Sequence, residues 1–381
     1  MAESKHILTV NAGGASLKLA LIEWATGHRL ATEYIVLSQA SRADKPQIRT
    51  HSDAFDTLLR RIDLAQVVGV GHRVVHGGTV FQQSIRISPK IKQGLERLND
   101  LAPLHNPPAL ELINAVEQKL PDVPQVAAFD TAFHFTLPPT SYLYPVPIAW
   151  FAERGLRRFG FHGLNLDYCV TRAASMLSKA TDTVTLVICH LGSGCSVTAI
   201  KGGRSIATTM GFTPLEGVMM ATRSGSVDPG LLLHLLRHNE FTTEALEDVL
   251  NHQSGLKGVS GTSGDMRDVL SACKRGDDRA KLALDLYVTR IREGIGTMLM
   301  HTGRIDALVF TDGVGEHVPE VRAATMRSLQ WLGIHIDETA NANVNDADVD
   351  IAGRDSSTHV LVIHNGEEHT LWRETRRVLD R

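Results

Sequence analysis

The sequence is short of net charge, of long apolar runs and of cysteine, and each shortage excludes a class of protein. Its 381 residues carry 39 Lys and Arg against 42 Asp and Glu, which gives a formal net charge of −3. Bulk electrostatics therefore favour neither nucleic acid nor a membrane surface as a partner. No apolar run in the sequence approaches the roughly 18 residues that a membrane-spanning helix needs.

The four cysteines show no CxxC pairing, and so few thiols in so long a chain do not make a disulfide framework. The polar residues 1–5 lack the layout of a secretory signal. We therefore expect a cytoplasmic protein. His72 and His76 have no third ligand at the spacing of a zinc site, which disfavours zinc. The Walker and GxGxxG motifs are also missing, so any phosphate site is of another kind.

The length and an internal repeat predict two related domains. Apolar, β-branched strand patterns separated by glycine turns run through the first 36 residues, and the same order recurs about half a chain later. Similarity on this scale predicts two α/β domains, each opening with a meander of three strands. The strand patterns cover residues 6–11, 17–24 and 28–36, and then 183–190, 195–201 and 204–209.

Helical patterns fill the intervals between the strands. Strands alternating with helices predict mixed or parallel sheets covered on both faces. Prolines at 138, 139, 145 and 147 interrupt the periodicity, which indicates a domain crossing near 145–150. The helical patterns cover residues 53–63, 89–99, 108–119, 165–178, 229–238, 243–251, 277–303 and 320–332, and a last strand at 359–364 precedes a helical tail at 367–379.

Three glycine-containing stretches follow strand patterns, at residues 11–18, 190–195 and 311–317. Backbone NH groups in such loops can point at an anion. Each stretch alone can equally be a simple turn, but two of the three occupy matched positions in the repeat. We therefore interpret them as candidate phosphate loops.

Two arginines give a sharper indication of chemistry. Arg73 in GHRVVHGG and Arg223 in TRSGSVDPG each sit among glycines, with few charged residues nearby in the sequence. A planar cation with five donors suits a transferring phosphoryl group. The alternative is that each arginine is a member of a surface ion pair.

Other polar residues in these segments have two interpretations each. Asp130, between aromatic residues in FDTAFHF, is a catalytic candidate or else a helix N-cap or turn residue. His162 in RRFGFHG is a catalytic candidate or a core histidine. Asp265 fits either a ligand contact or a helix N-cap. Glu367 and Glu368 fit either a magnesium site or the solvated first turn of a helix.

Together these segments resemble the acetate kinase family along nearly the whole chain. Nine motifs in the family's order carry the resemblance. They are VNAGGASLK at 10–18, GHRVVHGG at 71–78, APLHNPP at 102–108, FDTAFH at 129–134, RRFGFHG at 157–163, HLGSGCS at 190–196, MGFTPLEGVMMATRSGSVDPG at 210–230, GVSGTSGDMRD at 258–268 and FTDGVGEH at 310–317.

The resemblance implies an α/β fold with two duplicated domains around a nucleotide cleft. This is the ribonuclease H-like fold of sugar kinases, actin and heat-shock chaperone ATPases. It places an N-terminal α/β domain at 1–147, completed by the C-terminal helix 366–381, and a nucleotide-binding α/β domain at 148–365. It also implies a homodimer.

The family transfers the γ-phosphoryl group of ATP to acetate, giving acetyl phosphate and ADP, and the reaction is reversible. By resemblance, Arg73 and Arg223 hold the carboxylate and neutralise the transferring group. His162 donates a hydrogen bond to that group, and Asp130 orients the reactants and the metal. Such transfer needs mainly positioning and charge stabilisation from the protein.

The same resemblance assigns the metal, nucleotide and acyl sites. Asn11 and Glu367 match the neighbourhood of Mg²⁺ or Mn²⁺, with Glu368 as the alternative carboxylate, and His105 matches a structural position between the domains. The residues matched to the nucleotide are Lys18, His190, Leu191, Gly192, Ser193, Gly194, Asp265, Met266, Arg267, Asp312, Gly313, Val314 and Gly315. The residues matched to the small acyl pocket are Val75, Leu104, Phe161 and Pro214.

The sequence also departs from the family pattern at several positions. Gly14 and Ala15 replace two hydroxyl residues of the usual NAGSSSLK, and Ser193 replaces the asparagine of HLGNG. The usual GFHGTSH continues here as Gly163-Leu164-Asn165-Leu166, and GIGEN ends in His317. These changes touch the nucleotide side more than the acyl side, so they bear on the rate and the phosphoryl donor.

Several functions remain compatible with this sequence. The first is an acetate kinase, and the second is a kinase for propionate or butyrate or one with a donor other than ATP, because one methylene changes binding by only about 1–3 kcal/mol. A nucleotide-binding module with little turnover is an alternative of another class. A filament-forming or chaperone-like ATPase of the same fold is a further one.

Overall fold

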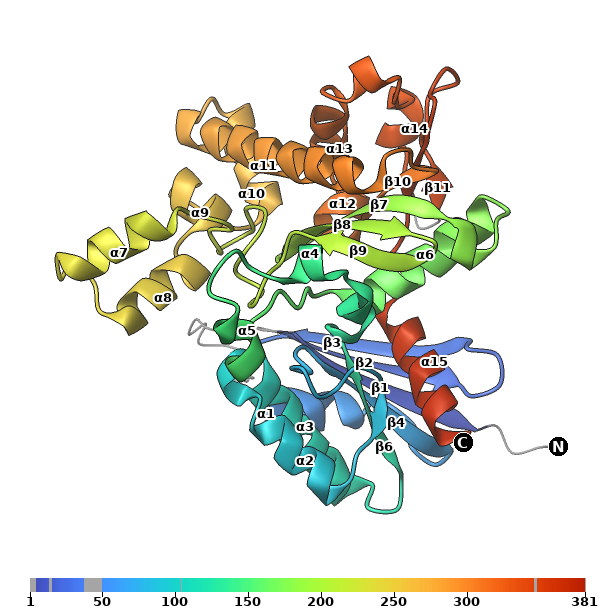
Figure 1. Ribbon diagram of the computed structural model, residues 1–381. Coiled ribbons are helices and arrows are strands. Elements are labelled where there is room, and N and C mark those ends of the chain that lie inside the picture. The colour runs from blue at the N-terminus through green and yellow to red at the C-terminus, as the bar shows by residue number, and fades with distance from the viewer. Residues whose placement is uncertain (1–4, 14–15, 38–49, 104, 346–347, 381) are drawn as a thin grey trace. The chain divides into compact units, whose positions relative to one another are not determined.

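The computed structural model describes residues 5–13, 16–37, 50–103, 105–345 and 348–380, and the chain forms two compact units (Figure 1). The first unit comprises Met1–Phe135, Phe161–Tyr168 and Gly366–Arg381, and the second comprises Thr136–Gly160 and Cys169–Asn365. The division into domains at 1–147 with 366–381 and at 148–365 stays a prediction.

The first unit is built on a six-stranded mixed sheet in the order β3-β2-β1-β4-β6-β5. β1, β4 and β6 run parallel to one another, and β2, β3 and β5 are antiparallel to their neighbours. The strands are β1 (His6–Gly13), β2 (Ser16–Glu23), β3 (Arg29–Val36), β4 (Val67–Val74), β5 (Ile85–Arg86) and β6 (Gln125–Phe129).

The second unit repeats this sheet strand for strand. Its order read from β9 is β9-β8-β7-β10-β12-β11, with the same parallel core and the same antiparallel edges. The duplication expected from the repeated glycine turns is therefore confirmed. The strands are β7 (Thr185–Leu191), β8 (Cys195–Lys201), β9 (Arg204–Thr208), β10 (Ala307–Thr311), β11 (Val349–Asp350) and β12 (His359–Val362).

Each predicted helical pattern coincides with a helix, although the pattern at 320–332 is divided between an α-helix that ends at Met326 and a 3₁₀ helix. The helices at 139–142, 149–154, 255–260, 266–274, 312–317 and 338–342 lie outside the predicted patterns. The α-helices are α1 (His51–Leu59), α2 (Pro89–Glu96), α3 (Asn106–Lys119), α4 (Pro139–Tyr142), α5 (Ala149–Arg154), α6 (Gly163–Met176), α7 (Pro229–Arg237), α8 (Thr243–His252), α9 (Gly255–Ser260), α10 (Met266–Lys274), α11 (Asp278–Thr302), α12 (Asp312–His317), α13 (Pro319–Met326), α14 (Glu338–Ala342) and α15 (Glu367–Leu379). The 3₁₀ helices are η1 (Asn99–Leu101), η2 (Ala132–Thr136), η3 (Thr181–Thr183) and η4 (Gln330–Leu332).

The sheet of the first unit is covered on both faces, as the sequence predicts. Leu8 and Val10 of β1 pack in one core with Phe55 of α1 and Leu112 of α3. Alternate residues of a strand point to opposite faces, and Ile7 accordingly lies in a separate core with Trp372 of α15. These layers anchor the N-terminus of α15 beside the parallel strands β1, β4 and β6.

In the second unit the 25-residue helix α11 packs against β7 and β8. Gly294 of α11 lies so close to Val197 of β8 that a Cβ there would be 3.0 Å from the valine side chain. The close approach brings the helix onto the two strands that the HLGSG turn connects.

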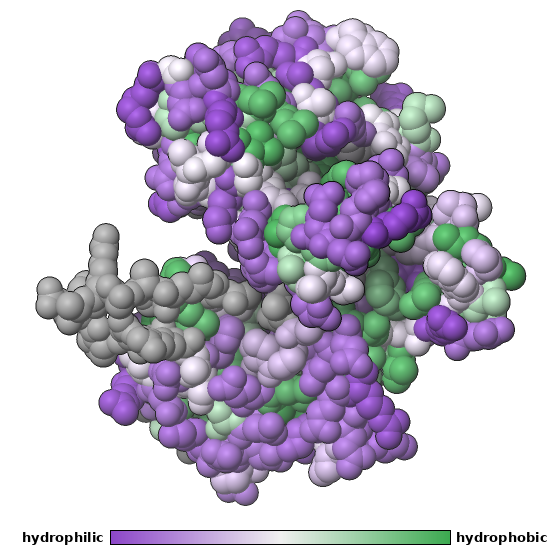
Figure 2. Space-filling view, turned by 90° about the vertical axis from the view of Figure 1, so that its left-hand side faces the viewer, coloured by the Kyte–Doolittle hydropathy of each residue, from purple (hydrophilic) through white to green (hydrophobic). Residues whose placement is uncertain are grey.

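No helix in the part of the chain that the structure describes is long and apolar enough to cross a bilayer. Hydrophilic residues predominate on the face drawn in Figure 2, with hydrophobic ones scattered among them. None of the four cysteines is bridged, and Cys169, Cys189 and Cys195 are buried.

Candidate active site

The first unit gathers four predicted site residues at one edge of its sheet. Asn11 lies in β1, Arg73 is the last residue but one of β4, and Asp130 directly follows β6. Because these strands are parallel neighbours, their carboxyl ends meet at the same edge. Glu367 joins them as the first residue of α15.

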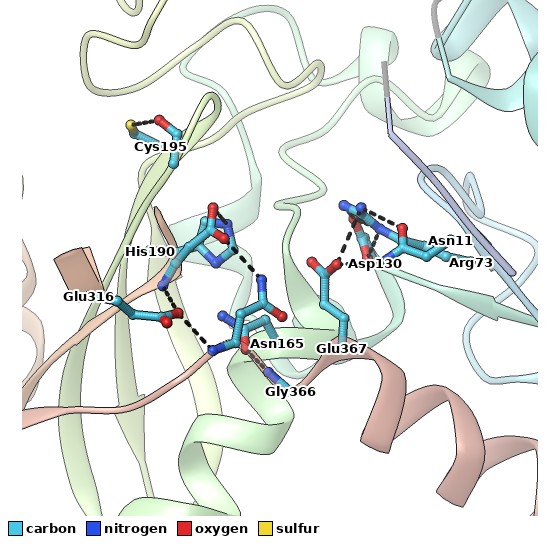
Figure 3. A network of polar contacts seen from close by, with 12 residues as sticks. Asn11, Arg73, Asp130, Asn165, His190, Cys195, Glu316, Gly366 and Glu367 are labelled. Atoms are coloured by element: carbon cyan, nitrogen blue, oxygen red, sulfur yellow. Dashed lines mark hydrogen bonds and ion pairs between the residues drawn. The ribbon is translucent and has the colours of Figure 1, made fainter. Parts of the chain in front are cut away.

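The guanidinium of Arg73 is the centre of this cluster (Figure 3). Its Nε donates to both Asp130 carboxylate oxygens at 3.1 and 3.2 Å, and its Nη2 donates to Asp130 Oδ2 at 2.7 Å. Its Nη1 donates to Asn11 Oδ1 at 3.1 Å and lies 3.5 Å from Glu367 Oε2. Asp130 is fully buried, so the pair is a shielded, two-pronged ion pair of the strong kind.

The surface ion-pair alternative for Arg73 is therefore wrong. Asp130 does lie in a turn directly after β6, and its carboxylate is paired with Arg73 there. The sequence suggests few partners for Arg73 because its partners lie 57 and 62 residues away along the chain. They belong to the neighbouring strand ends, which only the folded sheet brings together.

Glu367 and Glu368 are buried, 6% and 3% exposed, so their interpretation as a solvated first turn is wrong. Asn11 Nδ2 donates to Glu367 Oε2 at 2.8 Å, and Lys18 forms an ion pair with Glu368 at 2.8 Å. Asn165 Oδ1 accepts a bond of 3.0 Å from the backbone N–H of Gly366, immediately before α15. Asn165 is fully buried and was noted in the sequence only as a departure from the family pattern.

His162 lies directly before α6 in a strained backbone conformation. It is 8% exposed and has φ of 63°, in the left-handed region that non-glycine residues rarely adopt. The next residue, Gly163, donates its N–H to the Asp130 carbonyl at 3.1 Å, and a Cβ on Gly163 would lie 2.0 Å from that oxygen. The RRFGFHG and FDTAFH motifs are thus in direct contact. The strain at His162 is typical of a functional position.

The residues predicted to form the acyl pocket belong to different units. Val75 and Phe161 are buried in the first unit, and Pro214 is partly buried in the second. Leu104 lies outside the described residues, as do Gly14 and Ala15. His105 is the N-cap residue of α3. The pocket and the interdomain role of His105 stay predictions.

The second unit places a different group at the matching edge of its sheet. Asp312 directly follows β10, and its Oδ2 lies 3.2 Å from Nε2 of His190 in β7. Gly192 allows this approach, because a Cβ there would lie 1.8 Å from Asp312 Oδ2. Burial opposes the ionisation of Asp312, but His190 and the amide of Asn365 outweigh it and lower the pKa of the carboxyl. Asp312 also has a positive φ, 67°.

Within the stretch at 311–317, Asp312–His317 form the helix α12 and Thr311 is its N-cap, so the interpretation of this stretch as a glycine loop is wrong. Glu316 of α12 accepts bonds from the backbone N–H groups of Asp312 at 2.8 Å and of Asn365 at 2.7 Å (Figure 3). The buried carboxylate thereby joins the ends of β10 and β12. Glu316 is not among the site residues expected from sequence, because one of its partners is 49 residues away.

Pro214, Arg223 and Ser193 are predicted site residues of the second unit that lie on loops. Arg223 Nη1 donates to the carbonyl of Pro214 at 3.0 Å. The neighbouring Ala221 donates its N–H to the carbonyl of Ser193 at 3.2 Å, so the Arg223 segment contacts the HLGSG turn. Leu191 and Gly194 flank this turn and are buried.

Asp265 is the N-cap of α10, which confirms the N-cap interpretation of this residue. Its carboxylate accepts from the backbone N–H of Arg267 at 2.9 Å, and the Arg267 side chain lowers its pKa. Met266 is buried, whereas the Arg267 side chain is 86% exposed. A role for these three residues toward a nucleotide stays a prediction.

Among the described residues no three His, Cys, Asp or Glu side chains are grouped so as to hold a metal ion. Magnesium, however, is usually held by only one or two carboxylates together with substrate phosphates. The buried carboxylate of Glu367, 2.8 Å from the Asn11 amide, fits that donor set. Because Asn11 Oδ1 already accepts from Arg73, the carboxylate is the better ligand of the two.

Comparison with known proteins identifies the family. The model of the acetokinase family matches residues 6–373. The chain belongs to this family. The acetate kinase of Trichormus variabilis is 50% identical over 318 residues, which cover 84% of this chain and 78% of the relative. The acetate kinase of Microcystis aeruginosa is 44% identical over 97% of this chain and 98% of its own.

Solved structures agree with the sequence comparison. The acetate kinase of Porphyromonas gingivalis superposes with a TM-score of 0.88 at 33% identity, covering 99% of this chain and 100% of its own. A propionate kinase of Francisella tularensis superposes with a TM-score of 0.89 at 33% identity, covering 98% and 100%. The family and the duplicated α/β fold expected from the nine motifs are confirmed, as is membership in a family of kinases that use ATP.

Proposed function

We propose that this chain is an acetate kinase that transfers the γ-phosphoryl group of ATP to acetate and runs the reaction in both directions. The observation that carries the proposal is the buried Arg73–Asp130 pair at the carboxyl edge of the first sheet. It stands in a chain that shares 44–50% identity with relatives named acetate kinase.

In this proposal, Arg73 neutralises charge on the substrates while Asp130 fixes its orientation. Asp130 accepts from Nε and Nη2 on one edge of the guanidinium, so the plane of the cation is set before substrate arrives. Preorganised cations aimed at developing charge supply most of the rate in phosphoryl transfer. Arg223 supplies the second cation, and His162 supplies a hydrogen-bond donor.

We propose Glu367 as the principal protein ligand of Mg²⁺ in the complex with nucleotide. Glu368 is the weaker candidate, because it is paired with Lys18. Two carboxylates, Asp130 and Glu367, face the single positive charge of Arg73, and this excess of negative charge favours a cation. When bound, the ion would neutralise charge on the phosphate oxygens.

In the second unit we propose that the nucleotide contacts the HLGSG turn at 190–194 and the start of α12. The buried His190 pairs with the partly exposed Asp312 there, beside Gly192. The family resemblance also supports a homodimer acting in the cytoplasm. Sedimentation of the purified protein tests the homodimer, since a monomer at micromolar concentration would contradict it.

A second candidate function is propionate kinase, which the similarity to the Francisella tularensis structure favours. Both are tested by incubating the protein with MgATP and acetate, propionate, butyrate or no acid. Hydroxylamine traps the acyl phosphate, and ADP is measured in parallel. Acyl hydroxamate matched by ADP supports the proposal and ranks the acids. ADP without hydroxamate would indicate an ATPase, and neither product would contradict a kinase that uses ATP.

A further inference from the structure

The loop that follows β9 carries both Pro214 and Arg223, and its backbone holds the arginine. Arg223 Nη1 donates to the Pro214 carbonyl at 3.0 Å, and the carbonyl of Arg223 accepts from the N–H of Met220 at 3.2 Å. The position of the guanidinium therefore depends on where residues 209–216 lie. Those residues form no helix or strand of their own, so side chains from elsewhere must fix them.

Arg158 supplies one set of these contacts. Its Nη1 donates to the carbonyls of Thr209 at 2.8 Å and Met210 at 2.9 Å, and its Nη2 donates to Glu216 Oε1 at 2.5 Å. A single guanidinium thus joins the beginning of the loop to its end. Its side chain is 18% exposed, which shields these bonds from water.

Tyr144 supplies the other set of contacts. Its hydroxyl donates to Glu216 Oε2 and accepts from the backbone N–H of Phe212 at 2.8 Å. Burial and the nearby Glu216 carboxylate raise the pKa of this hydroxyl despite Arg158, so it remains a donor at neutral pH. One hydroxyl therefore satisfies a side chain and a backbone group of the same loop.

A glycine in the loop backbone leaves space for these hydrogen-bonded side chains. A Cβ on Gly211 would lie 1.6 Å from Glu216 Oε2 and 2.4 Å from the Tyr144 hydroxyl. Only glycine leaves room there for the carboxylate and the phenol together. The carbonyl of Gly211 also accepts from the N–H of Phe159 at 2.9 Å, which ties the loop to the segment that carries Arg158.

We propose that Tyr144 is a positioning residue for Arg223: through Glu216 and the Phe212 N–H it fixes the 209–216 loop whose Pro214 carbonyl holds the guanidinium. The inference rests on the proposed function, in which Arg223 binds the carboxylate. It adds a residue outside the motifs that carry the family resemblance. In this proposal Tyr144 does not contact the reacting atoms and acts only through the loop.

The test compares Tyr144→Phe with Tyr142→Phe. The first change removes one hydroxyl, which leaves the Phe212 N–H without this acceptor. The second is a matched control two residues upstream, because the contact of Arg157 with the Tyr142 ring, 3.9 Å from its centroid, is kept by phenylalanine. We expect faster amide hydrogen exchange at 209–216 and a rise of about tenfold in KM for the carboxylate in Tyr144→Phe alone. KM for ATP and the melting temperature should stay near wild type.

A double-mutant cycle sharpens the test. Glu216→Gln and Tyr144→Phe disturb the same contact, so their combined effect on KM should be well below the sum of the two. Unchanged exchange at 209–216 in Tyr144→Phe would overturn the inference. So would faster exchange with an unchanged KM for the acid, or equal changes in KM for acid and ATP with a lowered melting temperature. A wild-type protein that forms no acyl phosphate would refute the proposed function, while an unaltered exchange pattern would separately refute the role of Tyr144.

Discussion

The two sheets of this protein have the same strand order and the same strand directions, but the charged residues at the ends of the corresponding strands β4 and β10 are of opposite sign. At the end of β4 the first unit carries the cation Arg73, held by the anions Asp130 and Glu367. After the corresponding strand β10 the second unit carries the anion Asp312, held by His190 and Asn365. The two copies of the duplicated sheet therefore carry different residues at the matching edge.

The difference shows which part of the molecule determines function. Nearly continuous runs of buried residues along the parallel strands build both sheets, and they leave the first residues beyond each parallel strand free to vary. Those residues meet at one edge because the strands are parallel. The fold brings these residues together at one sheet edge, and their side chains determine the chemistry there.

Removal of Arg73 should have the largest effect. Arg73→Ala leaves Asp130 buried without its counter-ion, so we expect the free energy of unfolding to fall by about 3–5 kcal/mol. The loss of a cation at the transferring group should lower kcat/KM by roughly 10³. Acyl hydroxamate formation and unfolding in urea measure the two effects. Arg86→Ala, an exposed arginine of β5 in the same sheet, is the control; a stability equal to wild type in Arg73→Ala would argue against the buried pair.

Removal of Arg223 should separate activity from stability. Its guanidinium donates to a neutral carbonyl, that of Pro214, and it is only partly buried. We expect a rate loss of roughly 10² to 10³ with a fall in unfolding free energy of no more than about 1.5 kcal/mol. The same two assays apply. A stability loss as large as that of Arg73→Ala would mean that the two arginines are held alike, and a near-normal rate would remove Arg223 from the site.

A smaller effect is expected from adding one methyl group to the second unit. In Gly192→Ala the new Cβ would lie 1.8 Å from Asp312 Oδ2, so the carboxylate must move away from His190. We expect a loss of about 1–3 kcal/mol in stability and a rise of about tenfold in KM for ATP. Gly296→Ala, at an exposed position of α11, is the matched control, because no atom lies within 4 Å of a Cβ there. Equal KM values for ATP in the two variants would contradict this geometry.

The sequence predicts the scaffold better than it predicts the site. Hydrophobic periodicity and the two glycine turns reveal both meanders, and the pattern at 229–238 matches α7 closely. Local patterns cannot reveal contacts such as that of Asn165 with Gly366, which are 201 residues apart in the chain. Family resemblance names Arg73 and Asp130, but the sequence alone does not show that they form a pair. At 311–317 the glycines suggest a loop, whereas Glu316 caps the first N–H of a helix.

The smallest and most specific effect concerns pH. The pKa of Asp312 in the folded state is lowered below the usual value near 3.9. As the pH falls through about 4, the unfolded chain therefore binds more protons than the folded chain does. The ionised carboxylate therefore stabilises the fold above about pH 4, and this stabilisation is lost progressively at lower pH. Asp312→Asn removes the charge while tolerating the positive φ of this position.

The stability of wild type relative to Asp312→Asn should thus be larger at pH 5.5 than at pH 3.5, as measured by the urea midpoint at about these two values. Other carboxylates titrate in both proteins and cancel in the comparison. Asp130→Asn offers the contrast with the first unit, because its carboxylate faces a permanently charged guanidinium and not an imidazole. If the stability difference between wild type and Asp312→Asn were independent of pH, His190 and Asn365 would not stabilise the ionised carboxylate. The opposite charges at the ends of β4 and β10 would then be a difference of sequence without an electrostatic consequence.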